Sequence, residues 1–293
     1  MLLVVLIWGL NFTVTKLAFE EFPPLVFTAV RFTVASACIA FIIWRVEGSL
    51  RIPQGSLLRL TWLGFVGNSL YQCLFTLGLE RTTASNSSLV LASMPPTVAA
   101  LGALTGTERL SRNGRRGLLL ASLGVLLVVA SRGVDLSGRT VVGDALTVAA
   151  VLCWATFTIG VRRLTHAMSP LALTAWTTIL GTPFLVLAGL PQTLDMHWGD
   201  TSLGGWGGLA YSTFLSLIVA YVIWNRSVRV AGTNRTAIFM CVTPLVATGS
   251  AVLLLHERPR PVQLAGGALI LAGVLLSQLA TPPPVAGSEA AER

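Results

Sequence analysis

One stretch of the sequence places hydrogen-bonding side chains and aromatic rings on a single helix face. The spacing is i, i+3, i+4 and i+7, and the residues are Asn68, Tyr71, Gln72 and Phe75. Side chains at these intervals lie on one side of an α-helix. Polar groups within an apolar helix are costly, so they indicate function by default. Two amides, a phenol and a ring can bind a small zwitterion by hydrogen bonds and cover its apolar side chain.

Other aromatic and polar side chains fall at related positions of apolar stretches. Trp8 and Asn11 share a helix face near the N-terminus, and Trp154 is the equivalent of Trp8 in a second copy of the pattern. Tyr221 and Trp224 align with the second amide and the ring of the face described above. These residues are expected either to line a substrate pathway or to hold helices together and anchor them at the membrane interfaces. Tyr221 and Trp224 lie nearest a membrane surface and are the strongest candidates for anchors.

Prolines interrupt two apolar stretches at equivalent positions. Pro95 and Pro244 lie 149 residues apart, and Thr243 precedes the second of them. A proline leaves the carbonyl four residues earlier without its helical partner, so Leu91 and Met240 are expected to offer free oxygens. Paired interruptions in corresponding halves indicate a binding site or a gate. The alternative is a kink that shapes packing without touching a ligand.

Arg31 is a cation within an apolar stretch, seven residues after Pro24. This spacing places Arg31 about 10 Å along its helix. It is a possible partner for a substrate carboxylate. It is equally able to extend towards the membrane surface or to meet the C-terminus of a helix, which are structural roles.

The elements that carry these residues are predicted to cross a membrane. Hydrophobic residues make up 54% of the 293 and charged residues 11%, and the mean hydropathy is +0.76. A soluble domain carries about 25% charged residues, so lipid is the expected solvent. Apolar stretches of about 20 residues, enough to cross roughly 30 Å of hydrocarbon, recur along the chain. The predicted spans are 2–19, 24–45, 58–80, 85–106, 114–131, 143–163, 169–190, 204–224, 232–255 and 261–280.

The sequence is a duplication. The pattern Val-Leu-x-Trp that ends at Trp8 recurs 146 residues later, whereas Glu108-Arg109, with Gly-Val-Leu-Leu downstream, recurs 149 residues later. The change of offset predicts three additional residues in one loop of the second copy. We place the first unit at 1–133, the second at 134–281, and a disordered cytoplasmic tail at 282–293.

Five spans in each unit have a consequence for topology. An odd number of crossings inverts the second unit in the membrane, and many secondary transporters use such inverted repeats to build two alternately open faces around one site. The predicted fold is therefore an all-α integral membrane protein. Its ten transmembrane helices are expected to form two inverted five-helix repeats around a central cavity.

The net charge of +8 is spread over short loops between the spans and forms no patch. A nucleic-acid partner is therefore not expected. With both termini in the cytoplasm, the internal loops and the tail carry most of the 20 Lys and Arg residues, in agreement with the positive-inside rule. The expected location is the inner (plasma) membrane, crossed several times.

Acidic side chains and histidines are expected at the periphery. All twelve Asp and Glu and the three His map to loops, helix ends or the tail. Proton-coupled transporters often titrate a carboxylate or histidine inside the membrane, so proton coupling is not indicated. Sodium coupling through backbone carbonyls and facilitated movement are both left open. The four cysteines show neither zinc nor disulfide spacing, so no metal and no cofactor is expected.

The order of these features resembles the EamA-type unit of the drug/metabolite transporter superfamily. The motifs that carry the resemblance are Trp8-x-x-Asn11-Phe12-x-x-x-Lys16, Arg31-Phe32, and Glu108 and Glu257 with their downstream Gly-Val-Leu-Leu. The resemblance implies ten helices, with the fifth and tenth outside a cavity lined mainly by helices 1, 3, 4, 6, 8 and 9. It implies export of amino acids or other metabolites, with exporters of aromatic amino acids as the nearest guess. The second copy departs from the pattern, because Arg31 maps to Thr177 and Asn11 to Phe157.

The predicted function is secondary transport by alternating access, exporting amino acids or related small metabolites, with uncoupled and sodium-coupled export both left open. Aromatic or other hydrophobic amino acids are the favoured small-molecule substrates. The alternatives are a multidrug or other metabolite exporter and a channel-like facilitator, although no span shows the continuous polar stripe of a pore. Neither H-E-x-x-H nor G-x-S-x-G is present, so an intramembrane enzyme is not expected. The oligomeric state is expected to be a monomer or a homodimer in the lipid bilayer.

Overall fold

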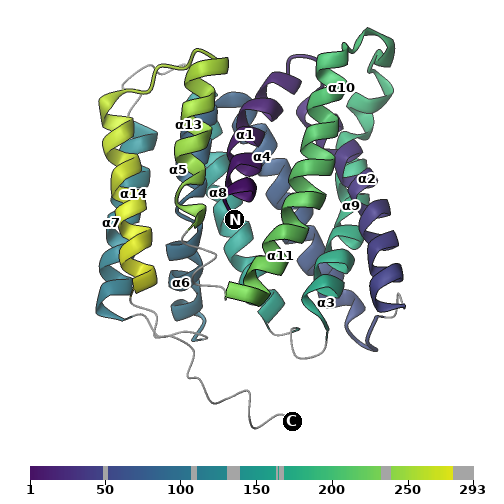
Figure 1. Ribbon diagram of the computed structural model, residues 1–293, viewed down its shortest axis with the longest axis horizontal. Coiled ribbons are helices and arrows are strands. Elements are labelled where there is room, and N and C mark those ends of the chain that lie inside the picture. The colour runs from purple at the N-terminus through teal and green to yellow at the C-terminus, as the bar shows by residue number, and fades with distance from the viewer. Residues whose placement is uncertain are drawn as a thin grey trace.

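The computed structural model describes residues 1–48, 52–106, 111–130, 139–162, 164, 168–231 and 239–279, and every regular element in these ranges is helical. The helices run up and down in one bundle (Figure 1). We call the end where α2 begins and α13 ends the upper end, and the end where α2 ends and α9 begins the lower end. Glu108 and the predicted tail lie outside the described residues.

The bounds of the helices follow most of the predicted spans, but residues 232–238, the start of the ninth predicted span, lie outside the described residues. In the first half they are α1 (Leu2–Ala18), α2 (Pro24–Glu47), α3 (Leu57–Gly64), η1 (Phe65–Leu70), α4 (Tyr71–Arg81), α5 (Ala84–Leu91), α6 (Met94–Leu104) and α7 (Arg112–Ala130). In the second half they are α8 (Arg139–Arg162), α9 (Pro170–Leu194), η2 (Trp198–Asp200), α10 (Leu203–Ala210), η3 (Tyr211–Val219), α11 (Ala220–Ala231), α13 (Thr243–Leu254) and α14 (Pro261–Leu279).

Six helical stretches of the described chain are long and apolar enough to cross a membrane. They are α2, α7, α9, most of α8, and the continuous stretches 84–104 and 203–224. The apolar helices α1, α13 and α14 are shorter. The chain is therefore a multi-pass membrane protein, whereas ten crossings and the inversion of the second half stay predictions.

Two long helices contain π-helical segments in their middle. Helices α3 and α10 both have 8 residues and begin 146 residues apart, at 57 and 203, but η1 has 6 residues and η3 has 9. Helices α4 and α11 then begin 149 residues apart, at 71 and 220. The three additional residues of the second copy therefore lie inside a π-helical segment, and the prediction of a longer loop is wrong. A π-helix holds more residues per turn, so it absorbs an insertion without breaking the helix.

The prolines begin helices after a break. Helix α5 ends at Leu91 and α6 begins at Met94 with Pro95 in its first turn, and α13 begins at Thr243 with Pro244 in its first turn. The first turn of a helix needs no partner for the backbone N–H, so it tolerates proline. The interruption that the sequence predicts is thus present in both halves.

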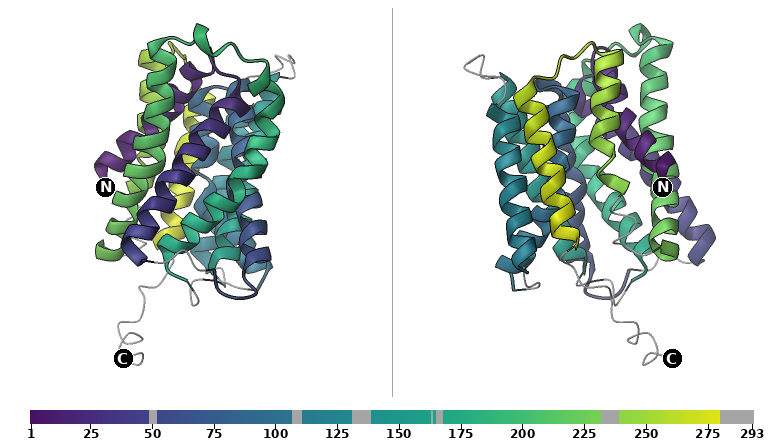
Figure 2. Two further views of the ribbon diagram at one scale, coloured as in Figure 1. Left: turned by 90° about the vertical axis from the view of Figure 1, so that its right-hand side faces the viewer. Right: turned by 60° about the vertical axis from the view of Figure 1, so that its left-hand side comes forward.

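Helices α7 and α14 lie side by side at one edge of the bundle (Figures 1 and 2), and they pack through paired glycines. A Cβ added to Gly117 would lie 2.5 Å from the carbonyl oxygen of Gly273, and one added to Gly124 would lie 2.5 Å from that of Gly266. The offset of 149 pairs Gly117 with Gly266 and Gly124 with Gly273 as repeat mates. The two helices are therefore antiparallel neighbours. The contact of Gly117 with Gly273 is equivalent, in the repeat, to the contact of Gly266 with Gly124.

A second contact between repeat mates lies at the opposite edge of the bundle, between α2 and α9. The hydroxyls of Ser36 and Thr182 are hydrogen-bonded at 2.7 Å, and the two residues are 146 positions apart, the offset of this part of the repeat. A residue that contacts its own mate lies on the axis that relates the two copies. Two halves with inverted orientations are expected to make both contacts. That the whole second half is inverted relative to the first stays a prediction.

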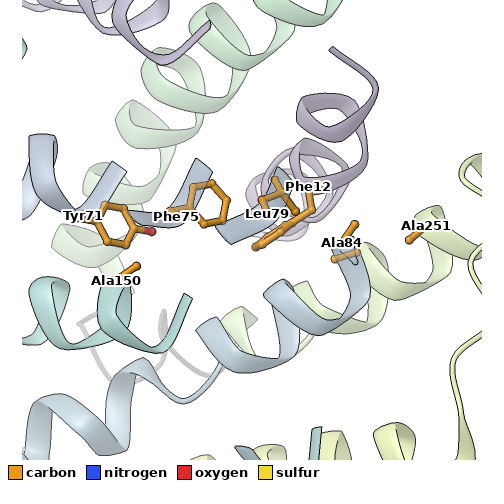
Figure 3. Packing of buried hydrophobic residues seen from close by; sticks show 8 residues of the cluster. Phe12, Tyr71, Phe75, Leu79, Ala84, Ala150 and Ala251 are labelled. Atoms are coloured by element: carbon orange, nitrogen blue, oxygen red, sulfur yellow. The ribbon is translucent and has the colours of Figure 1, made fainter. Parts of the chain in front are cut away.

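The centre of the bundle is filled by small and aromatic side chains from five helices. Figure 3 shows Tyr71 and Phe75 along α4, with Phe12 from α1 and Ala150 from α8 beside them. The rings of Phe12 and Phe75 meet edge to face, with their centroids 5.7 Å apart. The alanines allow the backbones of neighbouring helices to approach, as is usual in membrane helix packing.

We predict that Gly117→Ala destabilises the protein by about 1–3 kcal/mol, because overpacking forces α7 away from α14. The matched control is Gly249→Ala in α13, where an added Cβ meets no atom within 4 Å. The measurement is the thermal unfolding midpoint of both purified variants in the same detergent. Equal midpoints for the two variants would contradict the close packing of α7 on α14.

Candidate functional site

A cavity of about 210 Å³ lies between helices of the two halves. Its walls come from α2, from the helix that contains η1, and from α8, α9, η3 and α11. The lining residues are Phe32, Ala35, Ile39, Ile42, Asn68, Gln72, Trp154, Phe157, Leu171, Thr174, Thr177, Thr178, Leu217, Ile218, Tyr221, Val222 and Trp224. Ile42 lies near the end of α2 and Thr174 near the start of α9, so the cavity lies towards the lower end of the bundle.

Several polar atoms in and behind this cavity are buried without a hydrogen-bond partner among the described residues. Nδ2 of Asn68 and Oε1 of Gln72 belong to lining residues, and Oδ1 of Asn11 and two nitrogens of Arg31 are unpartnered as well. Buried polar groups in folded proteins are nearly always paired, so each exception needs an explanation. A bound molecule that hydrogen-bonds to these groups would supply one.

Arg31 continues the stripe of α2 that lines the cavity. Ala35, Ile39 and Ile42 line it at i+4, i+8 and i+11 from Arg31, so all four positions lie on one helix face. Arg31 is only 2% exposed, and its Nε and Nη1 have no hydrogen-bond partner among the described residues. It therefore neither extends to the surface nor donates these N–H groups to a helix C-terminus.

Aromatic side chains surround the guanidinium of Arg31. Its Cζ lies 5.7 Å from the ring centroid of Phe27 and 5.6 Å from that of Phe32, which is within the range of cation–π attraction. Tyr71 and Tyr221 lie within electrostatic range of the guanidinium. Since Phe32 and Tyr221 also line the cavity, the guanidinium lies directly behind its wall.

Two chains of rings form the aromatic walls. Trp154 contacts Tyr71 on one side and Phe157 on the other, with centroid distances of 5.2 Å to each. Trp8 lies behind Tyr221 and Trp224, with centroid distances of 5.6 Å to both. The indole N–H of Trp8 donates to the backbone carbonyl of Ser216 at 2.9 Å, which fixes its orientation.

The sequence-predicted residues fall into three groups. Those that line the cavity are Asn68, Gln72, Trp154, Tyr221 and Trp224. Those that pack behind it are Trp8, Arg31 and Tyr71, whereas Phe75 stacks on Tyr71 and Asn11 is buried in α1. Those outside the lining are Pro95, which is exposed, and Thr243 and Pro244, which are buried near the start of α13.

Two lining residues were seen in the sequence only as departures from the repeat. Phe157 is the mate of Asn11 and Thr177 is the mate of Arg31, and both line the cavity. The first half thus contributes amides and a cation, whereas the second half contributes a ring and hydroxyls at the same positions. The mismatch between mates was the signal that could have identified them.

Asp144 corrects the expectation that every acidic residue is peripheral. Its carboxylate is fully buried, in the second turn of α8, and accepts hydrogen bonds from Thr82 Oγ1 at 2.5 Å and from Asn86 Nδ2 at 3.1 Å. The positive end of a helix dipole and two donors favour a carboxylate there. Asp144 lies ten residues before Trp154 on α8, about 15 Å from the cavity wall along the helix axis.

Hydrogen bonds between the two halves join the upper end of the bundle. Glu257 accepts from the backbone N–H of Ala84 at 2.8 Å and from the hydroxyl of Ser85 at 2.6 Å, so it caps α5. Glu21 accepts from the backbone N–H of Ser202 at 2.6 Å and from its hydroxyl at 2.7 Å. The bonds from Ser202 lower the pKa of the Glu21 carboxyl.

We predict that Gln72→Met leaves the stability of the protein unchanged or raises it. Oε1 of Gln72 is buried without a partner, so replacing the amide by an apolar side chain of similar length removes a desolvation cost. The measurement is the unfolding midpoint in detergent, with Thr76→Val as the comparison, because Thr76 donates to the backbone at 2.7 Å. A loss of stability at Gln72 would mean that its amide holds helices together.

Known proteins similar to this chain share most of its length. A protein of Escherichia coli (strain K12), named a probable amino-acid metabolite efflux pump, is 32% identical over 292 residues, which are 94% of this chain and 92% of that protein. Its namesake in Salmonella typhimurium is 31% identical with the same coverage. An uncharacterized transporter of Bacillus subtilis is 25% identical over 91% of this chain and 88% of its own length.

A solved crystal structure shares the fold, with a TM-score of 0.64 at 18% identity over 96% of each chain. The model of the EamA-like transporter family matches residues 1–130 and again residues 141–279. Together these matches cover nearly the whole sequence, and they indicate a transporter and not an enzyme. The chain therefore belongs to the EamA-like transporter family, part of the drug/metabolite transporter superfamily.

Proposed function

We propose that the protein is a secondary transporter of the inner (plasma) membrane that exports amino acids or related small metabolites by alternating access. The favoured substrates are small metabolites with an aromatic or other hydrophobic side chain, either amino acids or their derivatives. The observation that carries the proposal is the cavity between the halves, which is lined both by Asn68 and Gln72, each with an unpartnered amide atom, and by the rings of Trp154 and Tyr221. The relatives named as probable amino-acid metabolite efflux pumps support the same substrate class.

The size of the cavity favours a small metabolite over a multidrug substrate. Pockets for drug-sized ligands have volumes of about 300–1,000 Å³. The cavity of this protein is smaller, at about 210 Å³. Its walls are mostly rings and aliphatic side chains, with two amides and three threonines among them, which suits a compact molecule with one polar end.

The packing of repeat mates supports alternating access. When two inverted halves exchange conformations, a contact between a residue and its own mate maps onto itself and is kept. The contact between Ser36 and Thr182 is of this kind. The contact between Thr15 and Ser212, at 3.4 Å near the upper end, joins residues that are not mates. The first contact is expected to act as a pivot and the second to open.

With both termini in the cytoplasm, the lower end of the bundle faces the cytoplasm. The cavity then lies on the side from which an exporter takes up its substrate, while hydrogen bonds such as those of Glu21 to Ser202 close the upper end. No Asp, Glu or His is among the described residues that line the cavity, which favours facilitated export. Asp144 is the buried carboxylate that a proton-coupled mechanism would use.

We predict saturable counterflow of hydrophobic amino acids or their derivatives by the purified protein in liposomes, screened with and without a pH gradient. Trp154→Ala removes part of the cavity wall and is expected to reduce counterflow about tenfold or more, since a well-packed aromatic anchor contributes over 1 kcal/mol. Trp62→Ala is the matched control, because the Trp62 side chain is 59% exposed on the outside of the bundle. Flux without saturation or trans-stimulation would indicate a channel-like facilitator.

Cysteine pairs test the pivot. Oxidising Thr15→Cys with Ser212→Cys is expected to abolish counterflow, because a disulfide there holds the upper end closed. Oxidising Ser36→Cys with Thr182→Cys is expected to leave most of the flux, because that contact is kept in both states. Flux that survives the first cross-link, with the disulfide verified by mass spectrometry and reversed by reductant, would refute alternating access.

A further inference from the structure

The region around the cavity has a positive charge beside it and, among the described residues, no negative charge. In the described part of the chain no Asp, Glu, Lys, Arg or His lines it, and Arg31 lies directly behind its wall on the same face of α2 as Ala35 and Ile39. Two N–H groups of Arg31 are unpartnered and buried. The binding region therefore carries one positive charge and no compensating negative charge of its own.

An uncompensated cation inside a membrane protein is strongly unfavourable, and a guanidinium keeps its proton rather than becoming neutral. A carboxylate is the ligand that best relieves this cost. It forms short charge-assisted hydrogen bonds with the fork of a guanidinium, and it makes the loaded cavity neutral. When the bound carboxylate neutralises Arg31, the conformational change that carries the substrate across the membrane has the lowest electrostatic free-energy cost.

An ammonium group on the same ligand would restore the unfavourable charge. Gln72, which lines the cavity, offers a neutral amide oxygen that accepts the N–H of an amide without needing a second charge. Asp144 lies about 15 Å along α8 from Trp154, and its carboxylate already accepts from Thr82 and Asn86. The region thus offers a strong partner for a carboxylate and no anionic partner for an ammonium.

The apolar part of the cavity selects the remainder of the ligand. Trp154, Phe157 and Trp224 present rings, and Ile39 and Ile42 present aliphatic surface. Resting on the proposed export function, we infer that the preferred substrates are hydrophobic monocarboxylates with a net charge of −1. N-acylated amino acids and 2-oxo acids with an aromatic or aliphatic side chain have this chemistry, whereas the free zwitterionic amino acids do not.

A net charge on the substrate makes export electrogenic. Arg31 stays charged in the loaded and the empty protein, so each cycle moves one negative charge across the membrane. An inside-negative potential drives a monoanion outward whichever way the protein is inserted. At 100 mV the potential sustains an outward concentration ratio of about 50-fold without any coupling ion.

The test uses full-length protein in liposomes with an imposed potassium diffusion potential. The probes are N-acetyl-L-phenylalanine and phenylpyruvate, each of charge −1, zwitterionic L-phenylalanine, and cationic L-phenylalaninamide. We expect the anions to be preferred by about tenfold or more in KM, and their efflux to accelerate when the lumen is negative. L-phenylalanine flux would show no response to the potential.

Variants of Arg31 test whether this residue causes the preference for anionic substrates. Arg31→Gln is expected to lose the preference for anions, whereas Arg31→Lys keeps the charge and hence the preference, with weaker binding because the fork is gone. Unfolding midpoints show whether each variant is folded. The response of wild-type transport to the membrane potential tests the inference even if a variant does not fold. Equal or better transport of L-phenylalanine or its amide would overturn the inference and leave the export function standing. Absence of saturable flux for all four probes and for the amino acids would overturn the export function itself.

Discussion

Lipid offers no hydrogen bonds, and this constraint explains most polar contacts of the bundle. A helix that stops inside a membrane protein exposes backbone groups that water cannot satisfy. Helix α5 has only eight residues, and its N-terminal N–H groups are satisfied by the side chain of Thr83 and by Glu257 from the other half. The start of α5 is therefore fully capped only while the two halves are in contact. Its conformation depends on the relation between the halves.

The same constraint makes the unpartnered groups informative. Other polar groups are satisfied within the chain, as Lys16 is by the carbonyls of Leu79 and Thr82 at the end of α4, although Asn86 and Trp176 each carry one unpartnered buried atom away from the cavity lining. The unpartnered atoms of Asn11, Arg31, Asn68 and Gln72 contrast with this pattern. Asn68 and Gln72 line one cavity and Arg31 lies behind its wall, and the other lining residues are rings, aliphatic side chains and three threonines. Because these atoms form no hydrogen bonds with the described residues, they are free to form hydrogen bonds with a ligand.

Much of this arrangement could be predicted from the sequence, because apolar length and duplication are properties of single segments. Spans, the break at Pro95, and the shared face of Asn68 and Gln72 follow from local spacing. The burial of Asp144 could not, because a loop residue and a buried helix residue look alike until Thr82 and Asn86 are brought to it. The same holds for residues that line the cavity only because a distant helix leaves space beside them.

The longer π-helical segment of the second half has a consequence for energetics. In a perfect inverted repeat, the inward-open and outward-open conformations would be images of one another and equal in energy. The three additional residues in η3, which contributes Leu217 and Ile218 to the cavity, have no counterpart in η1. In the alternating-access cycle that we propose, they would break this degeneracy at the cavity wall, so the two conformations would differ in free energy even when the protein is empty. The insertion would then give the transporter a preferred resting conformation that is independent of any gradient.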